Sequence, residues 1–334
     1  MTAAGESTEV TPDSLFQIAS GFMAAKHLFI ANELGLFAHL AGGPATLDDL
    51  APRAGIARPR LRIVADAMVA LGLLERQGDR YRNGPVAATF LSGATPADLR
   101  PFLRFWDRLS YPSWARFEAA VRTGQGQSTL HLAEEEQRIF SEGVEAIQAG
   151  PAQALPGAYD FSRHRRLLDV GGGTGSWLRA ILRRYPDLRA TLFELPAAAA
   201  LARRQLAADP TTRQVEVVAG DFFVDPLPGG HDAVLIANVV HLFSPEHSRD
   251  MLRRTREASP DGARLLLVDF WTDPTHTQPP FAALMAGEFL SITGEGDVYS
   301  VEEVAGWLGE TGWRLVEHRP VAGPISAIVA EAAG

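Results

Sequence analysis

The chain has 334 residues, of which 46% are hydrophobic and 21% are charged. This length suits two domains, and the composition is typical of a folded globular protein. The formal net charge of −9 argues against a nucleic-acid partner, and the absence of cysteine excludes disulfides and thiolate metal sites. The acidic N-terminus resembles no secretory signal, and no apolar run approaches the roughly 18 residues of a spanning helix, so we expect a cytoplasmic protein without a membrane partner.

The first part of the chain predicts helices followed by a hairpin. Residues 12–40 are apolar over most of a helical surface, which indicates burial in a core or against another subunit. Thr46, followed by Asp48 and Asp49, predicts a helix start, a second helix covers about 58–71, and LLERQGDRYRNG predicts a hairpin. This winged-helix pattern serves DNA binding or dimerisation, and the acidic chain favours dimerisation.

After a helical, aromatic-rich stretch over about 85–159, the pattern changes to short apolar strands. The runs RLLDVGGG, ATLFEL, VEVVAGD, DAVLIANVV and ARLLLVDF alternate with amphipathic segments, as in a parallel α/β sheet. We therefore expect a helical winged-helix dimerisation domain over 1–160, contributing to a substrate pocket, and a Rossmann-like doubly wound domain over 161–334.

The glycine-rich segment after the first of these strands predicts a nucleoside cofactor. Glycines let the backbone approach a ligand, and the following helix offers free N–H groups. A dinucleotide turn needs G-x-G-x-x-G, but Ser176 and Trp177 follow here. Methyltransferases instead show the G-x-G-x-G spacing that occurs here at Gly171, Gly173 and Gly175. Asp169 precedes this segment, and Gly172 lies within it.

Two further strand ends carry acids that suit a nucleoside. Glu194 ends the second strand, where an acid can accept hydrogen bonds from ribose hydroxyls, although NAD enzymes use this position in the same way. Asp221 ends the third strand, and Phe222 and Phe223 follow it. An acid beside an aromatic face suits an adenine ring.

Five segments resemble, in this order, the motifs of the plant and bacterial small-molecule O-methyltransferases: LLDVGGGTG, FELP, GDFF, NVVHLFSPEH and GDVYSVEEVAGWLGETGW. The resemblance covers essentially the whole chain. It implies S-adenosyl-L-methionine as cofactor, S-adenosyl-L-homocysteine as product, and a homodimer that methylates a hydroxyl of a small aromatic or polyketide-like secondary metabolite, as in antibiotic biosynthesis.

The resemblance also implies roles for individual residues. His241 matches the family's general base, and Asp269 falls where an acid orients that histidine. Leu195 and Asn238 are implied as further cofactor contacts. The side chains implied to face the substrate are Trp106, Phe140, Met285 and Phe289. No metal is expected, because the spacing of His241, Asp269, Glu288 and Asp297 matches no ligand motif.

Two departures from the family pattern keep alternatives open. Leu242 and Phe243 follow His241 where the pattern has an acid or amide and then Trp, and Val298 stands where plant members have a second acid. The same fold and cofactor could therefore serve methylation at carbon or nitrogen, or a relative that transfers no methyl group. A winged-helix regulator that senses a metabolite is the alternative of another class.

For methyl transfer to a hydroxyl, placement of the nucleophile is expected to dominate. Effective molarity contributes roughly 7–11 kcal/mol, whereas a general base adds about 10²- to 10⁴-fold. With a phenol near pKa 10 and a histidine near 6.5 as reference values, prior proton transfer is uphill by about 3.5 units. We therefore expect the proton to move together with the methyl group.

Overall fold

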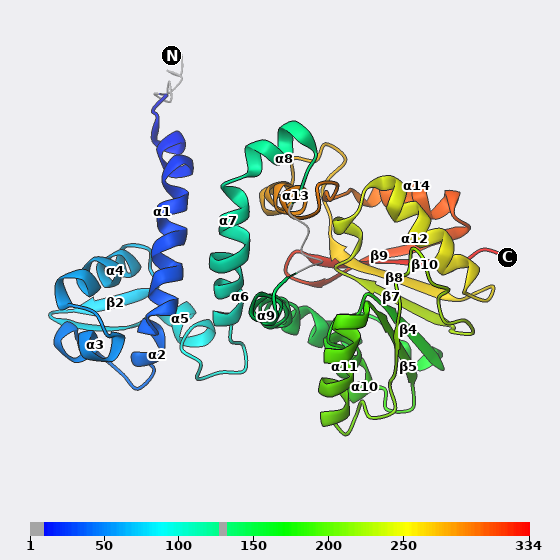
Figure 1. Ribbon diagram of the computed structural model, residues 1–334, viewed down its shortest axis with the longest axis horizontal. Helices are drawn as coiled ribbons and strands as arrows, with labels where there is room; N and C mark the ends of the chain where they lie inside the picture. Colours follow the sequence, from blue (N-terminus) through cyan, green and yellow to red (C-terminus); the bar gives the residue numbers. More distant parts are fainter. Residues whose placement is uncertain (1–9, 127–131) are drawn as a thin grey trace, which may run out of the picture. The chain divides into compact units, whose positions relative to one another are not determined.

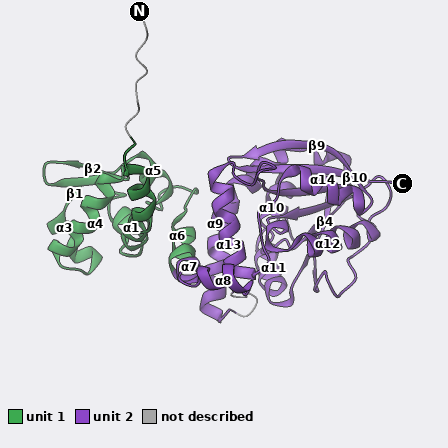
Figure 2. Cartoon of the chain, turned by 90° about the horizontal axis from the view of Figure 1, so that it is seen from above, with its two compact units in different colours: residues 1–107 green, residues 108–334 purple. Residues whose placement is uncertain are grey.

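The computed structural model describes residues 10–126 and 132–334. The chain divides into two compact units, 1–107 and 108–334 (Figure 2). This division falls earlier in the chain than the domain boundary expected near residue 160. Within the described ranges, none of the helices combines the length and apolar character needed to cross a bilayer.

The first unit contains the expected order of helix, helix and hairpin. It comprises α1 (Asp13–Glu33), α2 (Leu36–His39), β1 (Ala45–Thr46), α3 (Leu47–Ala54), α4 (Arg58–Ala70), β2 (Leu74–Gln77), β3 (Arg80–Asn83), α5 (Pro85–Phe90) and α6 (Arg100–Phe105). Thr46 caps α3, since its hydroxyl accepts the Asp49 N–H at 3.2 Å and the Asp49 carboxylate accepts the Thr46 N–H at 3.0 Å. β2 and β3 pair antiparallel, which confirms the hairpin.

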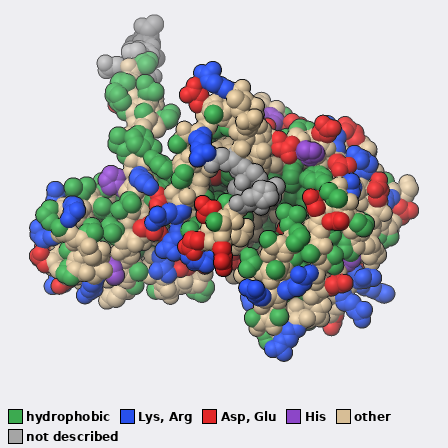
Figure 3. Space-filling model, viewed as in Figure 1, with side chains coloured by type: hydrophobic (Ala, Val, Ile, Leu, Met, Phe, Trp, Pro, Cys, Tyr) green, Lys and Arg blue, Asp and Glu red, His purple; other side chains and the backbone are tan. Residues whose placement is uncertain are grey.

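Helix α1 is apolar along its length but only partly covered within the first unit. Phe29 near its end is buried, whereas Phe16, Ile18 and Phe22 are 62%, 79% and 54% exposed. Figure 3 shows apolar side chains gathered along this helix. An exposed apolar helix face of this kind is typical of an interaction surface.

The second unit opens with helices and continues into a seven-stranded sheet. A π-helical turn (Trp106–Ser110), whose first two residues belong to the first unit, leads into α7 (Tyr111–Trp114), α8 (Phe117–Thr123) and α9 (Glu134–Ala158). The strands are β4 (Arg166–Val170), β5 (Arg189–Glu194), β6 (Glu216–Ala219), β7 (Ala233–Ala237), β8 (Arg264–Phe270), β9 (Trp313–Ala322) and β10 (Ile325–Ala332). Their spatial order is β6-β5-β4-β7-β8-β10-β9.

The five strands expected from the sequence form the parallel part of this sheet. The chain order reverses at β4, between β5 and β7, and ligands of such sheets bind beyond the carboxyl ends at this switch point. Strands β9 and β10 were not expected from the sequence. They pair antiparallel with each other, and β10 pairs antiparallel with β8.

Helices cover both faces of the sheet, as Figure 1 shows. They are α10 (Ser176–Arg184), α11 (Pro196–Ala208), α12 (Pro245–Glu257), α13 (Pro280–Thr293) and α14 (Val301–Glu310). Because side chains alternate along a strand, Leu167 belongs to one core with buried residues of α9, α10, α11 and α13, whereas Leu168 belongs to another core with residues of α12 and α14. These two cores hold the carboxyl ends of the central strands in fixed positions.

Candidate active site

The turn after β4 has the backbone conformation that its glycines predict. Gly171, Gly173 and Gly175 have φ angles of 68°, 55° and 86°, in the left-handed region that favours glycine. Gly175 is also the N-cap of α10, so the free N–H groups of that helix begin where the turn ends. A Cβ on Gly172 would lie 2.4 Å from Asp169 Oδ2. The turn therefore has no room for a side chain at Gly171, Gly172 or Gly175, whereas Gly173 is required by its φ angle alone.

Asp169, at the end of β4, is fully buried beneath this turn. Neither of its carboxyl oxygens has a hydrogen-bond partner among the described residues. Burial, together with the nearby charge of Glu194, raises the pKa of Asp169 to about 8. A buried carboxyl without partners is costly, and a cationic ligand group at the turn would relieve that cost.

Glu194, at the end of β5, is tied to the same turn. Its Oε2 accepts the Gly173 N–H at 2.9 Å, and its Oε1 accepts the Leu195 N–H at 2.7 Å. Burial raises the pKa of Glu194, and these two N–H groups oppose that shift. The structure thus brings together Asp169, the glycines, Glu194 and Leu195, whose side chain is 37% exposed.

The acid and phenylalanines after β6 join a cluster of aromatic rings. Asp221 Oδ1 accepts the Phe223 N–H at 2.9 Å, and the Phe222 and Phe223 centroids lie 4.6 Å apart. Phe243 meets both rings edge-on, at 5.7 and 5.0 Å. Phe243, which stands where the family motif has Trp, therefore packs against Phe222 and Phe223, the rings expected to contact the adenine.

His241 lies in a 3-10 turn (Val240–Leu242) just beyond β7, and the carboxyl end of β8 supplies its partner. His241 Nδ1 lies 2.7 Å from Asp269 Oδ1, and the residues are 7% and 1% exposed. A carboxylate can only accept, so Nδ1 carries the hydrogen and Nε2 is left to accept a proton. Nε2 has no hydrogen-bond partner in the described part of the chain. This is the geometry of a general base with an orienting acid.

Two phenylalanines fix the plane of the imidazole. The Phe289 ring, from α13, stacks on His241 with centroids 3.8 Å apart and planes at 16°. The Phe270 ring stacks at 5.4 Å and 23°. Phe270 could not be predicted from the sequence, because it contacts His241 only through the pairing of neighbouring strands. Both rings keep water from the histidine and restrict its rotation.

Glu145 on α9 was also missed from the sequence. Its Oε2 accepts the Thr174 hydroxyl at 2.7 Å and the Ser176 hydroxyl, and its Oε1 accepts from Arg179. All three donors lie in the glycine turn or in the first turns of α10. Glu145 therefore fixes the turn from outside the sheet, through contacts between residues far apart in sequence.

The remaining expected residues lie in several elements. Asn238 follows β7 with a φ of 56°, an uncommon value for a residue other than glycine. Met285, on α13, packs against the sheet core, and Phe140 is partly buried on α9. Trp106 belongs to the first unit, where its ring lies 4.4 Å from that of Phe102.

Val298 fills the position of the second acid with a fully buried apolar side chain. The turn before it approaches His241 closely, since Asp297 N–H donates to the His241 carbonyl at 3.1 Å and a Cβ on Gly296 would lie 2.6 Å from that oxygen. The segment thus supports the histidine through its backbone. Throughout the described ranges, no group of three or more His, Asp and Glu side chains is arranged to hold a metal ion.

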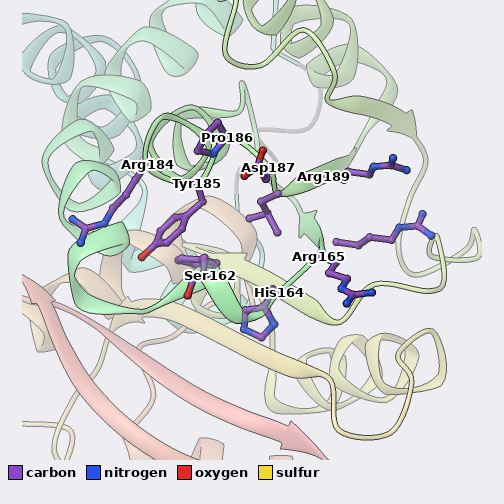
Figure 4. Close-up of a pocket in the computed structure, with 11 residues that line it drawn as sticks. Ser162, His164, Arg165, Arg184, Tyr185, Pro186, Asp187 and Arg189 are labelled. Carbon is purple, nitrogen blue, oxygen red and sulfur yellow. The ribbon is translucent and has the colours of Figure 1, made fainter.

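A cavity of about 590 Å³ lies at the amino ends of β4 and β5, away from the glycine turn at their carboxyl ends. Figure 4 shows that Arg165, Arg184 and Arg189 point in different directions rather than toward one another. The arginines do not converge on one anion. Ligands of open α/β sheets bind at the opposite edge, so the carboxyl-end residues remain the candidate site.

Comparison with known proteins agrees with this site. Residues 115–314 match the O-methyltransferase domain, and residues 16–93 match the O-methyltransferase dimerisation domain. The chain is 33% identical to a tetracenomycin polyketide synthesis 8-O-methyltransferase of Streptomyces glaucescens, covering 94% of each chain. It is 35% identical to a 3-hydroxy-5-methyl-1-naphthoate 3-O-methyltransferase of Streptomyces sahachiroi, covering 90% and 89%. The structure of human N-acetylserotonin methyltransferase in complex with S-adenosylmethionine aligns with a TM-score of 0.89, 25% identity, and coverage of 99% and 100%.

Proposed function

Because the chain belongs to the O-methyltransferase family and is an S-adenosylmethionine-dependent enzyme, we propose that it methylates a phenolic hydroxyl of a polycyclic or polyketide-derived aromatic compound, with His241 as general base. The observation that carries this proposal is the buried pair of His241 and Asp269, joined at 2.7 Å. The relatives named for a polyketide and a naphthoate support the acceptor class. This proposal excludes two alternatives, a winged-helix regulator and a relative that transfers no methyl group.

The residues around the turn fit the cofactor. Asp169 offers two unpartnered buried oxygens, and Gly171, Gly172 and Gly173 leave the backbone bare. We assign the methionine end to these residues and to Gly175, the ribose to Glu194, the adenine to Asp221, Phe222 and Phe223, and further contacts to Leu195 and Asn238. When bound, S-adenosylmethionine supplies an electrophilic methyl group on a sulfonium.

In the proposed mechanism, Nε2 of His241 takes the proton of the acceptor hydroxyl. Asp269 keeps the hydrogen on Nδ1 and stabilises the imidazolium that forms. Phe289 and Phe270 hold the ring and exclude water, so that the hydroxyl is the nucleophile that reaches the site. A base of this kind contributes about 10²- to 10⁴-fold.

The proposed assembly is a homodimer that uses α1. The dimerisation match covers residues 16–93, and α1 leaves a set of apolar side chains exposed within its unit, namely Leu15, Phe16, Ile18, Phe22 and Met23. Sedimentation equilibrium should give twice the mass of the chain. Replacing Phe16 and Phe22 with Ser should shift the equilibrium toward the monomer, and a wild-type monomer at micromolar concentration would contradict the assembly.

The reaction is tested by mass spectrometry with a panel of naphthols, hydroxynaphthoates and anthracyclic phenols and with S-adenosylmethionine. We expect a product heavier than its acceptor by one CH₂ unit, with the new methyl group on oxygen by NMR. A methyl group on nitrogen or carbon would contradict the hydroxyl acceptor. No product with any aromatic phenol would contradict the proposed acceptor class.

A further inference from the structure

Glu288 on α13 is a buried carboxyl that methyl transfer does not use. It is 4% exposed. Its Oε2 accepts from the Ser110 hydroxyl at 2.8 Å and from the Trp114 indole N–H at 2.6 Å. Its Oε1 is also buried but has no hydrogen-bond partner among the described residues. Buried polar atoms are nearly always paired, so this oxygen calls for a donor that is not part of the described chain.

The position of Glu288 on α13 relates it to the catalytic histidine. The next residue, Phe289, stacks on His241 at 3.8 Å. Phe281, Leu284 and Met285 stand seven, four and three residues before Glu288, so they share its side of the helix. The Phe281 ring lies 5.9 Å from Phe270, which in turn stacks on His241. Aromatic contacts thus link α13 to the base at two points, at Phe289 next to Glu288 and at Phe281.

The apolar side chains on this face differ in exposure. Leu284 is 70% exposed and Phe281 is 45% exposed, whereas Met285 is partly buried. A flat apolar acceptor could lie along these three side chains and bring a polar group to the buried Oε1. The face therefore matches an aromatic compound that carries polar groups at two positions.

We propose that Glu288 Oε1 accepts a hydrogen bond from a second hydroxyl or amino group of the aromatic acceptor, and thereby selects which hydroxyl lies against His241. The assignment rests on the proposed function. It makes Glu288 a specificity-determining residue: it binds the acceptor at a point away from the reacting oxygen. A site built to hydrogen-bond a hydroxyl discriminates strongly against an analogue that lacks it.

The surroundings of Glu288 favour this role over a purely structural one. Two donors already anchor Oε2, and a Cβ on Gly287 would lie 2.9 Å from Trp114 Cη2, so α13 and α7 are in close contact. A carboxyl needed only to join these helices would not leave its second oxygen buried without a partner. Burial raises the pKa of Glu288, against the effect of Ser110 and Trp114, which is the cost that a bound donor would offset.

The test compares two acceptors that differ by one O-methyl group, 1,3-dihydroxynaphthalene and 3-methoxy-1-naphthol, so that the second lacks one hydroxyl donor. Their dissociation constants are measured by calorimetry on the enzyme saturated with S-adenosylhomocysteine, and kcat/KM is measured with S-adenosylmethionine. A methoxy oxygen can accept but not donate, so the wild-type enzyme should favour the diol by about 10-fold or more. Equal affinity of the wild-type enzyme for the two compounds would overturn the proposal without any variant.

Glu288→Gln is the informative variant because it preserves shape. Its amide oxygen can take the place of Oε2 against Ser110 and Trp114, which turns the NH₂ group toward the acceptor. We expect the preference for the diol to disappear or reverse, while the affinity for S-adenosylhomocysteine is unchanged. Glu257→Gln, an exposed position on α12, is the matched control and should behave as wild type.

The outcomes separate this proposal from the one it rests on. Methyl transfer with an unchanged diol preference in Glu288→Gln would overturn the role of Glu288 and leave the proposed function standing. Absence of both binding and methyl transfer for every aromatic phenol tested would overturn both. If Glu288→Gln does not fold, the wild-type preference and that of Glu288→Leu decide the question.

Discussion

Replacing Asp269 with Asn isolates the contribution of its charge to the base. The side chain is 1% exposed and lies 2.7 Å from His241 Nδ1, so solvent cannot replace it. Asn has nearly the same shape, and its oxygen can still accept from Nδ1 and from the Phe270 N–H. In the wild-type protein this N–H donates to Asp269 Oδ1 at 2.9 Å. The variant therefore removes the charge and leaves the geometry.

The expected magnitude follows from the hydrogen bond to a charged group. Such a bond is worth about 1.5–3 kcal/mol, and the imidazolium that benefits from it forms during methyl transfer. Since each 1.36 kcal/mol is a factor of ten, kcat should fall by about 10- to 150-fold. Asp269→Glu keeps a carboxylate and should lose less activity than Asp269→Asn.

The assay measures kcat by the conversion of S-adenosylmethionine to S-adenosylhomocysteine at saturating acceptor, together with the dissociation constant of S-adenosylhomocysteine. That constant should stay within about twofold, because Asp269 is assigned no cofactor contact. An Asp269→Asn enzyme that is folded and has the kcat of wild type would refute the role of Asp269.

Three further predictions concern the cofactor end of the site. Asp169 is neutral below its pKa of about 8. The affinity for S-adenosylhomocysteine, measured by calorimetry, should therefore rise by up to about tenfold per pH unit toward pH 8. This pH dependence should be absent in Asp169→Asn. Because this pKa is raised from 3.8, the stabilising effect of the neutral carboxyl is lost as pH rises through about 8, and thermal denaturation of the cofactor-free protein should show the decline. Glu145→Gln removes the charge that holds Thr174 and Ser176, so cofactor affinity should fall by about tenfold or more, whereas Glu142→Gln on the same helix should bind as wild type. Equal affinities in these two variants would contradict the role of Glu145.

The parallel strands could be predicted because each is a short apolar run between amphipathic segments. β9 could not be predicted in this way, because it lies at the sheet edge and carries Glu317, His318 and Arg319 in mid-strand. An edge strand is solvated on one side, so its sequence lacks the apolar run that marks a central strand. β10 was missed with it, although it is mostly buried.

The candidate residues that could be predicted are those next to a strand end or within a short motif. The glycine turn, Glu194, Asp221 and His241 are of this kind. Phe270, Glu145 and the partners of Glu288 could not be predicted, because they reach the site through tertiary packing alone. Glu145 lies 29 residues before Thr174, and Ser110 lies 178 residues before Glu288. No local sequence pattern indicates such contacts.

His241→Ala decides whether His241 is the base of an S-adenosylmethionine-dependent O-methyl transfer. Its kcat for a phenolic acceptor and its affinity for S-adenosylhomocysteine are measured on the same preparation. We expect kcat to fall by about 10²-fold or more while the affinity is nearly unchanged. Turnover equal to that of wild type would contradict it.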